Sequence, residues 1–193
     1  MKNRYIKIIN IAFILLLLIG CNTNISENLI NGRETVRYAK AELINRQAET
    51  DAKIKEYLDD KSYTFTDPKV LVNPYEIAPL TALIIFNTDK KTAIGVNIND
   101  YLYFDTVETT QHIIPIYGLY DGKDNIITLT DDDGSTGQVV IHTESFKGER
   151  LNVEISDVDK LDDKVYFLSP NFVENCIYDK YGNLLWYIND DYA

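Results

Sequence analysis

The sequence is poor in the residues on which most enzymatic and metal chemistry depends. Its 193 residues include two cysteines, two histidines, one tryptophan and one methionine. Two cysteines cannot form the dense disulfide framework of a small secreted domain, and they do not have the CxxC spacing of a redox or zinc site. No glycine-rich phosphate loop and no serine or cysteine nucleophile motif is present. The sequence therefore contains no complete catalytic constellation and no motif for a cofactor or a metal ion.

Long hydrophobic runs are also missing, with one exception at the N-terminus. A basic segment, residues 2–7, precedes an apolar stretch, Ile8 to Ile19, that is too short to span a bilayer comfortably. The stretch continues into residues 18–21 (LIGC), in which an aliphatic residue, a spacer and a small residue precede a cysteine. This is the lipobox pattern that lipoprotein signal peptidase recognises.

We therefore predict that residues 1–20 are a lipoprotein signal peptide and that Cys21 is the lipidation site. The alternative is an ordinary cleaved signal with an incidental cysteine. The first interpretation predicts an exported lipoprotein of the cell envelope, held on the membrane through the lipid at Cys21, since several acyl chains anchor stably. Cys176 would then have no cysteine partner, and its strand-like surroundings favour a buried structural cysteine.

Positive charge is scarce as well. The chain has 19 lysines and arginines against 30 aspartates and glutamates, a formal net charge of −11. This balance argues against nucleic acid and against anionic membrane surfaces as partners, because both attract basic proteins. A solvated acidic surface is its simplest explanation.

Residues 21–62 are predicted to form a polar tether followed by a helix, from about Arg33 to Asp60. Asn31 and Glu34 have the spacing of a capping box. The apolar stripe of this helix is sparse, so it cannot bury a broad face. We expect a spacer helix that docks partly on the following domain, with a coiled-coil dimer as the weaker alternative.

Residues 63–145 are predicted to form a β-sandwich of immunoglobulin or fibronectin type III character. Ile94, Val96 and Ile98 alternate with small or polar residues, as in a half-buried antiparallel strand. His112, Ile114 and Ile116 share one face of another strand, in which Pro115 indicates an edge or a bulge. About seven such short strands follow one another at the spacing typical of a sandwich.

Residues 146–193 contain a few further strand-like segments. The segments Cys176 to Asp179 and Leu184 to Ile188 flank a hairpin signal, residues 180–183. Exposed leucines and a tryptophan here would be an apolar liability. Either these strands fold back on the sandwich, or the polypeptide is a fragment of a longer gene product.

Several stretches together resemble the N-terminal domain of bacterial arylsulfate sulfotransferases. They are residues 73–75 (NPY), residues 79–86 (PLTALIIF) followed by Thr88, and residues 114–120 (IPIYGLY), with the lead-in residues 63–70. Residues 178–187 (YDKYGNLLWY) are similar to the start of that family's β-propeller. The sequence departs from the pattern at Glu76, where the family carries glycine.

The resemblance implies a reaction class but not a site in this chain. The family transfers a sulfuryl group from a phenolic sulfate ester to a phenol, through a histidine of the propeller that becomes sulfated. We expect those residues to lie beyond Ala193 and this chain to be inactive by itself. The resemblance makes it the accessory domain of a sulfotransferase, with a propeller or a second subunit as partner. The alternative is a self-contained surface lipoprotein that uses the sandwich as a binding or spacer module.

Few side chains elsewhere could carry chemistry. His112 lies in phase with two core isoleucines, and His142 has no triad or metal spacing around it, so we expect neither to be catalytic or a ligand. Residues 131–134 (DDDG) lack the alternating ligands of an EF-hand and indicate a turn with glycine at positive φ. The fourteen tyrosines fit half-buried strand surfaces, and a carbohydrate- or phenol-binding surface built from them has no support in the sequence alone.

Overall fold

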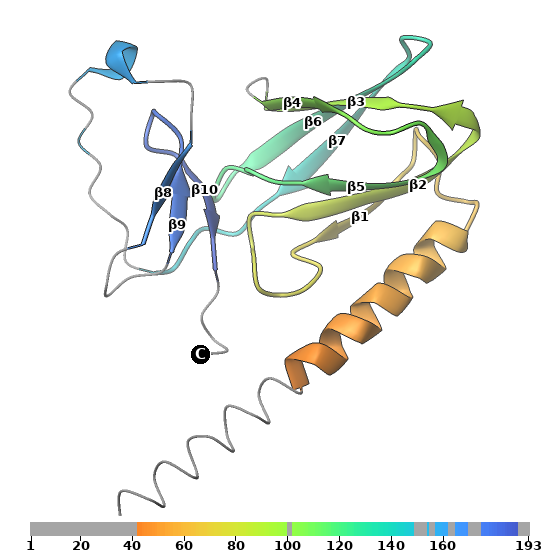
Figure 1. Ribbon diagram of the computed structural model, residues 1–193, viewed down its shortest axis with the longest axis horizontal. Helices are drawn as coiled ribbons and strands as arrows, with labels where there is room; N and C mark the ends of the chain where they lie inside the picture. Colours follow the sequence, from red (N-terminus) through yellow and green to blue (C-terminus); the bar gives the residue numbers. More distant parts are fainter. Residues whose placement is uncertain are drawn as a thin grey trace, which may run out of the picture. The chain divides into compact units, whose positions relative to one another are not determined.

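The computed structural model describes residues 42–99, 102–148, 154, 157–161, 165–169 and 175–188. The chain divides into two compact units, residues 1–45 with residue 193, and residues 46–192. The described residues of the smaller unit, 42–45, are helical. In the larger unit residues 46–59 are helical and β-strands follow (Figure 1). The predicted signal peptide, Cys21 and the predicted start of the helix lie outside the described residues.

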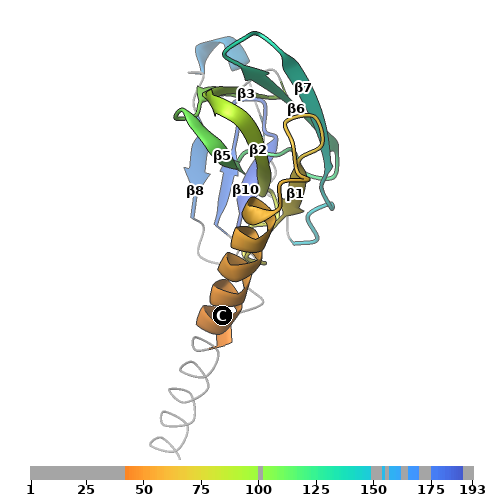
Figure 2. The same ribbon diagram turned by 90° about the vertical axis from the view of Figure 1, so that its right-hand side faces the viewer.

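Seven strands of the larger unit form two antiparallel sheets stacked face to face (Figures 1 and 2). The first sheet has the order β1-β2-β5, made from β1 (Lys69–Val72), β2 (Ala82–Thr92) and β5 (Thr109–Ile116). The second has the order β4-β3-β6-β7, made from β3 (Ile94–Ile98), β4 (Leu102–Asp105), β6 (Asp124–Asp131) and β7 (Thr136–His142). The predicted immunoglobulin-like sandwich, preceded by a helix, is therefore confirmed.

The core lies between the two sheets and follows from alternation along the strands. Side chains at every second position of a strand point to the same face. Both sheets turn such a set of aliphatic and aromatic side chains inward, and these are at most 2% exposed: Ala82, Ile84, Phe86, Ile94, Val96, Ile98, Ile114, Ile116, Ile127, Leu129 and Ile141. The predicted inward face of residues 112–116 is correct, and Pro115 lies on the edge strand β5.

Two features of the sheets could not be read from the sequence pattern. Strand β1 lies in the segment interpreted as a lead-in, where four residues after Pro68 pair with β2 from Lys69↔Ile85 to Val72↔Ala82. Strand β4, whose counterpart in an immunoglobulin constant-type sandwich joins the first sheet, pairs here with β3 in the second. β1 is therefore an edge strand of the first sheet, and β4 is an edge strand of the second.

The C-terminal end of the helix is fastened to the first sheet. Asn87 of β2 donates through Nδ2 to the carbonyl oxygens of Leu58 (3.1 Å) and Asp60 (3.2 Å), and Gln111 of β5 donates to Leu58 O (3.3 Å). These side chains satisfy terminal carbonyls that have no partner within the helix. Ile54 of the helix is 7% exposed, so the predicted partial docking of the helix is present. None of the helices described is both long and apolar enough to cross a membrane.

A third sheet follows a short 3-10 helix, η1 (Val158–Lys160). Its order is β10-β9-β8, formed by β8 (Tyr166–Leu168), β9 (Cys176–Tyr178) and β10 (Leu184–Tyr187). One face of this sheet joins the core of the sandwich through four side chains that are at most 9% exposed: Cys176, Tyr178, Leu184 and Tyr187. The ring of Tyr187 meets that of Phe146 edge-on at 4.5 Å. These strands therefore fold back on the sandwich, as one of the two expectations had it.

The corner before β6 is held by one buried amide. Asn125, 0% exposed, donates to the carbonyl oxygens of Tyr120 (3.0 Å), Lys123 (3.2 Å) and Ile141 (3.3 Å). Its Oδ1 accepts from the backbone N–H of Tyr120 (2.6 Å) and from Nδ2 of Asn99 (2.7 Å). Since β6 and β7 both begin or end here, this side chain replaces the backbone partners that a corner cannot supply.

Replacing this amide is predicted to destabilise the sandwich more than any ordinary polar substitution. Asn125→Ala should lower the free energy of unfolding by about 3 kcal/mol, because several buried backbone groups lose their partners together. Asn87→Ala removes the β2 amide that bonds the more exposed C-terminal end of the helix. This substitution should lower the free energy of unfolding by about 1 kcal/mol. Urea titrations of the two variants measure both values, and similar losses in both would contradict this role of Asn125.

Candidate functional site

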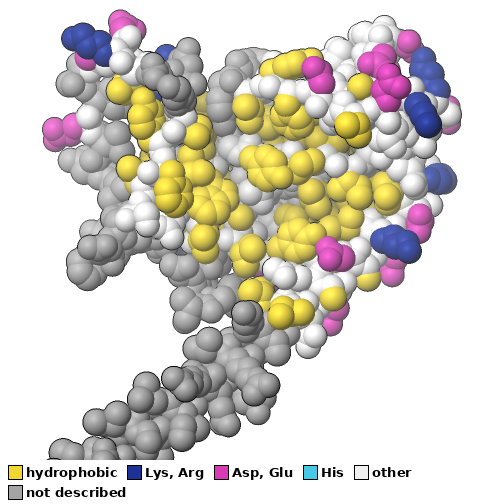
Figure 3. Space-filling view, viewed as in Figure 1, with side chains coloured by type: hydrophobic (Ala, Val, Ile, Leu, Met, Phe, Trp, Pro, Cys, Tyr) yellow, Lys and Arg dark blue, Asp and Glu magenta, His cyan; other side chains and the backbone are white. Residues whose placement is uncertain are grey.

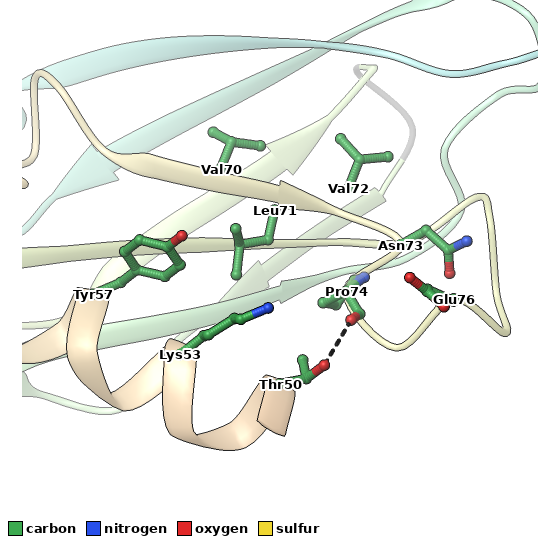
Figure 4. A pocket seen from close by; sticks show the side chains of 9 residues that line it. All are labelled: Thr50, Lys53, Tyr57, Val70, Leu71, Val72, Asn73, Pro74 and Glu76. Carbon is green, nitrogen blue, oxygen red and sulfur yellow. Dashed lines mark hydrogen bonds between the residues drawn. The ribbon is translucent and has the colours of Figure 1, made fainter. Parts of the chain in front are cut away.

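A concavity lies beside the edge strand β1, and we call it the helix–β1 groove (Figure 4). It has a volume of about 350 Å³ and is open to solvent. The helix contributes one wall, strand β1 a second, and the turn that follows β1 closes one end. The lining residues are Thr50, Lys53, Tyr57, Val70, Leu71, Val72, Asn73, Pro74 and Glu76.

The turn that closes the groove has an unusual backbone. Asn73 and Glu76 adopt φ angles of 47° and 62°, in the left-handed region that favours glycine. Asn73 fixes the turn, because its Oδ1 accepts from Ala78 N (3.0 Å), its carbonyl from Glu76 N (2.9 Å), and its N–H donates to Thr81 O (2.8 Å). The position where the sequence carries Glu76 instead of the family's glycine is therefore one where a glycine would be relaxed.

Three side-chain contacts join the turn to the helix. Thr50 donates to Pro74 O (3.3 Å), Tyr75 donates through its hydroxyl to Asp51 (2.7 Å), and Arg46 pairs with Glu76 (3.2 Å). The hydrogen bond to Asp51 raises the pKa of Tyr75, so this phenol stays protonated at neutral pH. The helical side of the groove was not predicted from the sequence, although Thr50, Lys53 and Tyr57 have the spacing of one helical face.

The groove offers charged and aromatic groups for recognition. Lys53 supplies an ammonium group, Glu76 a carboxylate and Tyr57 a phenol, and no lining residue is a histidine, cysteine or serine. Lys69 lies with its Nζ 4.6 Å from the centre of the Tyr57 ring, a cation–π contact at the rim. Such a surface can hold a polypeptide or a small polar molecule, but nucleophilic catalysis needs a nucleophile beside a base.

The structure separates the two histidines. His112 lies on β5 of the first sheet, 2% exposed, with its ring stacked on that of Phe86 at 4.6 Å. Burial lowers the pKa of His112, so its imidazole is neutral at neutral pH. Its Nε2 lies 3.2 Å from Thr88 Oγ1, whose hydroxyl donates to Lys90 O (2.8 Å). This pair resembles a hydroxyl and its base, but the ring is closed off from any substrate.

His142 lies on β7 of the second sheet, where it is exposed and pairs with Asp124 at 2.8 Å. Cys176 is buried in β9, 2% exposed, as its strand-like surroundings predicted. In the described part of the chain, no three side chains of histidine, cysteine, aspartate or glutamate are grouped so as to hold a metal ion. The residues considered for chemistry are therefore not brought together.

The acidic loop at residues 131–135 is a turn of the hairpin between β6 and β7. Gly134 has φ of 80°, and Asp131 accepts through Oδ1 from the N–H groups of Asp133 (3.0 Å) and Ser135 (2.8 Å). The same arrangement recurs between β9 and β10, where Asp179 accepts from Tyr181 N (2.9 Å) and Asn183 N (2.8 Å). Asp131 and Asp179 therefore each serve the backbone of a turn, and residues 131–134 form the predicted turn with glycine at positive φ.

The left-handed conformation of Glu76 leads to a test of the turn. Glu76→Gly should be more stable than Glu76→Ala by about 1 kcal/mol, because both lose the carboxylate and only alanine keeps the strained φ. The matched pair Glu144→Gly and Glu144→Ala, at a position without positive φ, should not show this preference. Urea unfolding measures the two differences. A glycine variant at position 76 that is no more stable than the alanine variant would contradict the assigned backbone.

A comparison with known proteins places these strands in a family. Residues 69–148 match the family model of the arylsulfotransferase Ig-like domain. No curated protein matches the chain. The matched range begins with the first residue of β1 and includes all seven strands of the sandwich. The motifs at residues 73–75, 79–86 and 114–120 all lie within it, and the structure gives them structural roles in the groove turn, β2 and the corner. Residues 69–148 are therefore an N-terminal Ig-like domain of the arylsulfate sulfotransferase family.

Proposed function

We propose that this protein is an exported lipoprotein that presents a non-catalytic Ig-like accessory domain to a sulfuryl-transferring β-propeller. Lipidation at Cys21 would place it on a membrane of the cell envelope, with residues 22–41 and the helix as a spacer. Sulfuryl transfer from a phenolic sulfate ester to a phenol would be the reaction of the propeller, not of this chain. The family match supports the accessory role, since domains of this kind accompany a catalytic domain.

The observation that carries the proposal is the outward face of the third sheet. Phe167 of β8 is paired with Ile177 of β9, which is paired with Trp186 of β10, so these three side chains form one row across the sheet. The row lies on the face opposite to the one buried in the sandwich. Phe167 is 60% exposed, and the neighbouring Val165 is 57% exposed. Figure 3 shows hydrophobic side chains gathered over these strands.

An apolar row of this kind, in which Phe167 is exposed and Ile177 and Trp186 are partly buried, is suited to a permanent protein partner. Interfaces of stable complexes are enriched in phenylalanine and tryptophan at their centre, surrounded by polar residues. A propeller blade needs four strands and neighbouring blades, so a three-stranded sheet of this type is suited to packing beside one. The second candidate, a self-contained binding or spacer module, is favoured by the burial of Leu184 and Tyr187 in the core of the sandwich.

The anchoring part of the proposal predicts covalent lipid on one cysteine. Cells that express the full chain and take up an alkyne-labelled fatty acid should yield a labelled product. Cys21→Ala should remove the label, because the thiol that receives the acyl glycerol is gone, whereas Cys176→Ala should keep it. Gel fluorescence of the purified chains measures the label. An unlabelled native chain, or a labelled Cys21→Ala chain, would rule out lipidation at this position.

The accessory role predicts binding without turnover. The purified chain should transfer no sulfuryl group from 4-nitrophenyl sulfate to phenol, but should bind a separately purified propeller of the family. Phe167→Asp should weaken that binding by at least about tenfold, because a charge in a desolvated interface is unfavourable. Ile113→Asp, at a 44% exposed position on β5, is the matched control and should bind normally. Transfer by the chain alone would refute the non-catalytic assignment, and absence of any complex would favour the self-contained module.

A further inference from the structure

The outward face of the four-stranded sheet carries two register rows that cross β4, β3, β6 and β7. We call them together the Tyr103 face. The first row consists of Tyr103, Asn97, Thr128 and Gln138, and the second of Asp105, Gly95, Thr130 and Thr136. On the two central strands, the residues that alternate with these positions are buried in the core: Ile94, Val96, Ile98, Ile127 and Leu129. The members of both rows therefore point outward. The family match assigns no role to this face.

A glycine allows the Tyr103 ring to lie against the sheet. A Cβ atom at Gly95 would lie 2.7 Å from Tyr103 Oη and 3.4 Å from its Cε2, so a larger residue would force the ring to move from this position. The hydroxyl of Tyr103 donates to Asp105 Oδ1 at 2.6 Å, which fixes the position of the ring. Glycine inside a strand weakens it and often marks a close approach of another group. The opposite side of the ring faces solvent, and Tyr103 is 63% exposed.

The Tyr103 face is almost free of charge on a chain that is otherwise rich in it. The chain has 49 charged residues among 193 when its 30 acidic and 19 basic residues are counted together. The two rows contain one of them, Asp105, whose carboxylate accepts the hydroxyl of Tyr103. The remaining side chains are amides and threonine hydroxyls. An anionic polymer finds no cation here, so the face is suited to a neutral polar ligand.

The neighbouring row supplies an apolar strip beside these polar groups. Ile126 of β6 is paired with Val140 of β7, and they are 48% and 62% exposed. An aromatic ring, two aliphatic side chains and a row of amides and hydroxyls therefore lie together. A pyranose ring has the complementary chemistry, because its C–H face packs on an aromatic ring and its hydroxyls both donate and accept hydrogen bonds.

We propose that the Tyr103 face binds a neutral oligosaccharide of β-1,4-linked pyranose units, with one sugar ring packed on Tyr103. The row from Tyr103 to Gln138 crosses three gaps between strands, which at about 4.8 Å each amounts to about 14 Å. This length accommodates a short oligosaccharide. Equatorial 1,4-linkages give a flat ribbon that matches an extended sheet surface, whereas α-1,4-linked chains curl away from it.

The test is a titration of the isotope-labelled full chain, in mild detergent, with cellotetraose and chitotetraose. Backbone amide shifts of Asn97, Tyr103, Thr128 and Gln138 should move with either sugar and saturate. Maltotetraose, which has α-1,4-linkages, should bind at least about tenfold more weakly. Tyr103→Ala should weaken binding of the flat sugars by about tenfold or more, whereas Tyr181→Ala, at a 61% exposed tyrosine of the β9–β10 turn, should bind like the native chain.

Tyr103→Phe separates binding from folding, because it keeps the ring over Gly95 and loses only the hydroxyl that donates to Asp105. This variant should bind within about threefold of the native chain. Shifts in the native chain do not depend on any variant folding correctly. The proposal is overturned if neither flat tetrasaccharide moves the amides of the Tyr103 face, if maltotetraose binds equally well, or if Tyr103→Ala binds as tightly as the native chain.

Discussion

The amide of Asn125 is the constraint on which the sandwich depends. At the end of the sheet where β6 begins and β7 ends, this amide donates to the carbonyl oxygens of Tyr120, Lys123 and Ile141 and accepts from the N–H of Tyr120. Asn99, which has φ of 49°, completes the network by donating to Asn125 and accepting from Ile126 N (2.8 Å). Buried polar networks of this kind specify one arrangement of the chain, because a partly satisfied network is strongly unfavourable.

The family's motifs become intelligible once this corner is fixed. Residues 114–120 end β5 and lead into the corner, and residues 79–86 begin β2. Leu119 and Leu80 are both fully buried, and Leu119 N donates to Leu80 O at 3.4 Å, so the two motifs meet in the core. They identify the domain because its packing requires them. This explains why residues that lie in the core of the domain also carry its family signature.

Most of the fold could be predicted from the sequence, because apolar residues at every second position of the strands form the inward faces of both sheets. The burial of Ile94, Val96 and Ile98 follows from their alternation with small or polar residues along one strand. Gly134 indicated the turn in which it lies. Strand β1 could not be found in this way, since four residues after a proline carry too little periodicity and their pairing depends on β2. The groove residues could not be predicted either, because their neighbours are distant in the sequence. Lys53 and Tyr57 come to lie beside strand β1 only when the helix docks on the sheet. Whether Leu184 would be buried depended on the core of the sandwich, which is built from residues distant from it in the sequence. Cys21 lies outside the described residues, so its role stays a prediction.

The carboxylate of Asp179 adds a polar link between the sandwich and the third sheet. Asp179 holds the β9–β10 turn through the N–H groups of Tyr181 and Asn183, and it also accepts a hydrogen bond from the hydroxyl of Tyr120. Burial, the charge of Asp179 and this hydrogen bond raise the pKa of Tyr120, so the phenol remains a donor throughout the physiological range. Tyr120 is itself held by Asn125. The hairpin is therefore tied to the same corner that fixes the sandwich, and the outward row of Phe167, Ile177 and Trp186 belongs to a surface whose position is set before any partner arrives. A pre-organised surface of this kind loses little conformational entropy on binding, which favours a stable complex over a transient one.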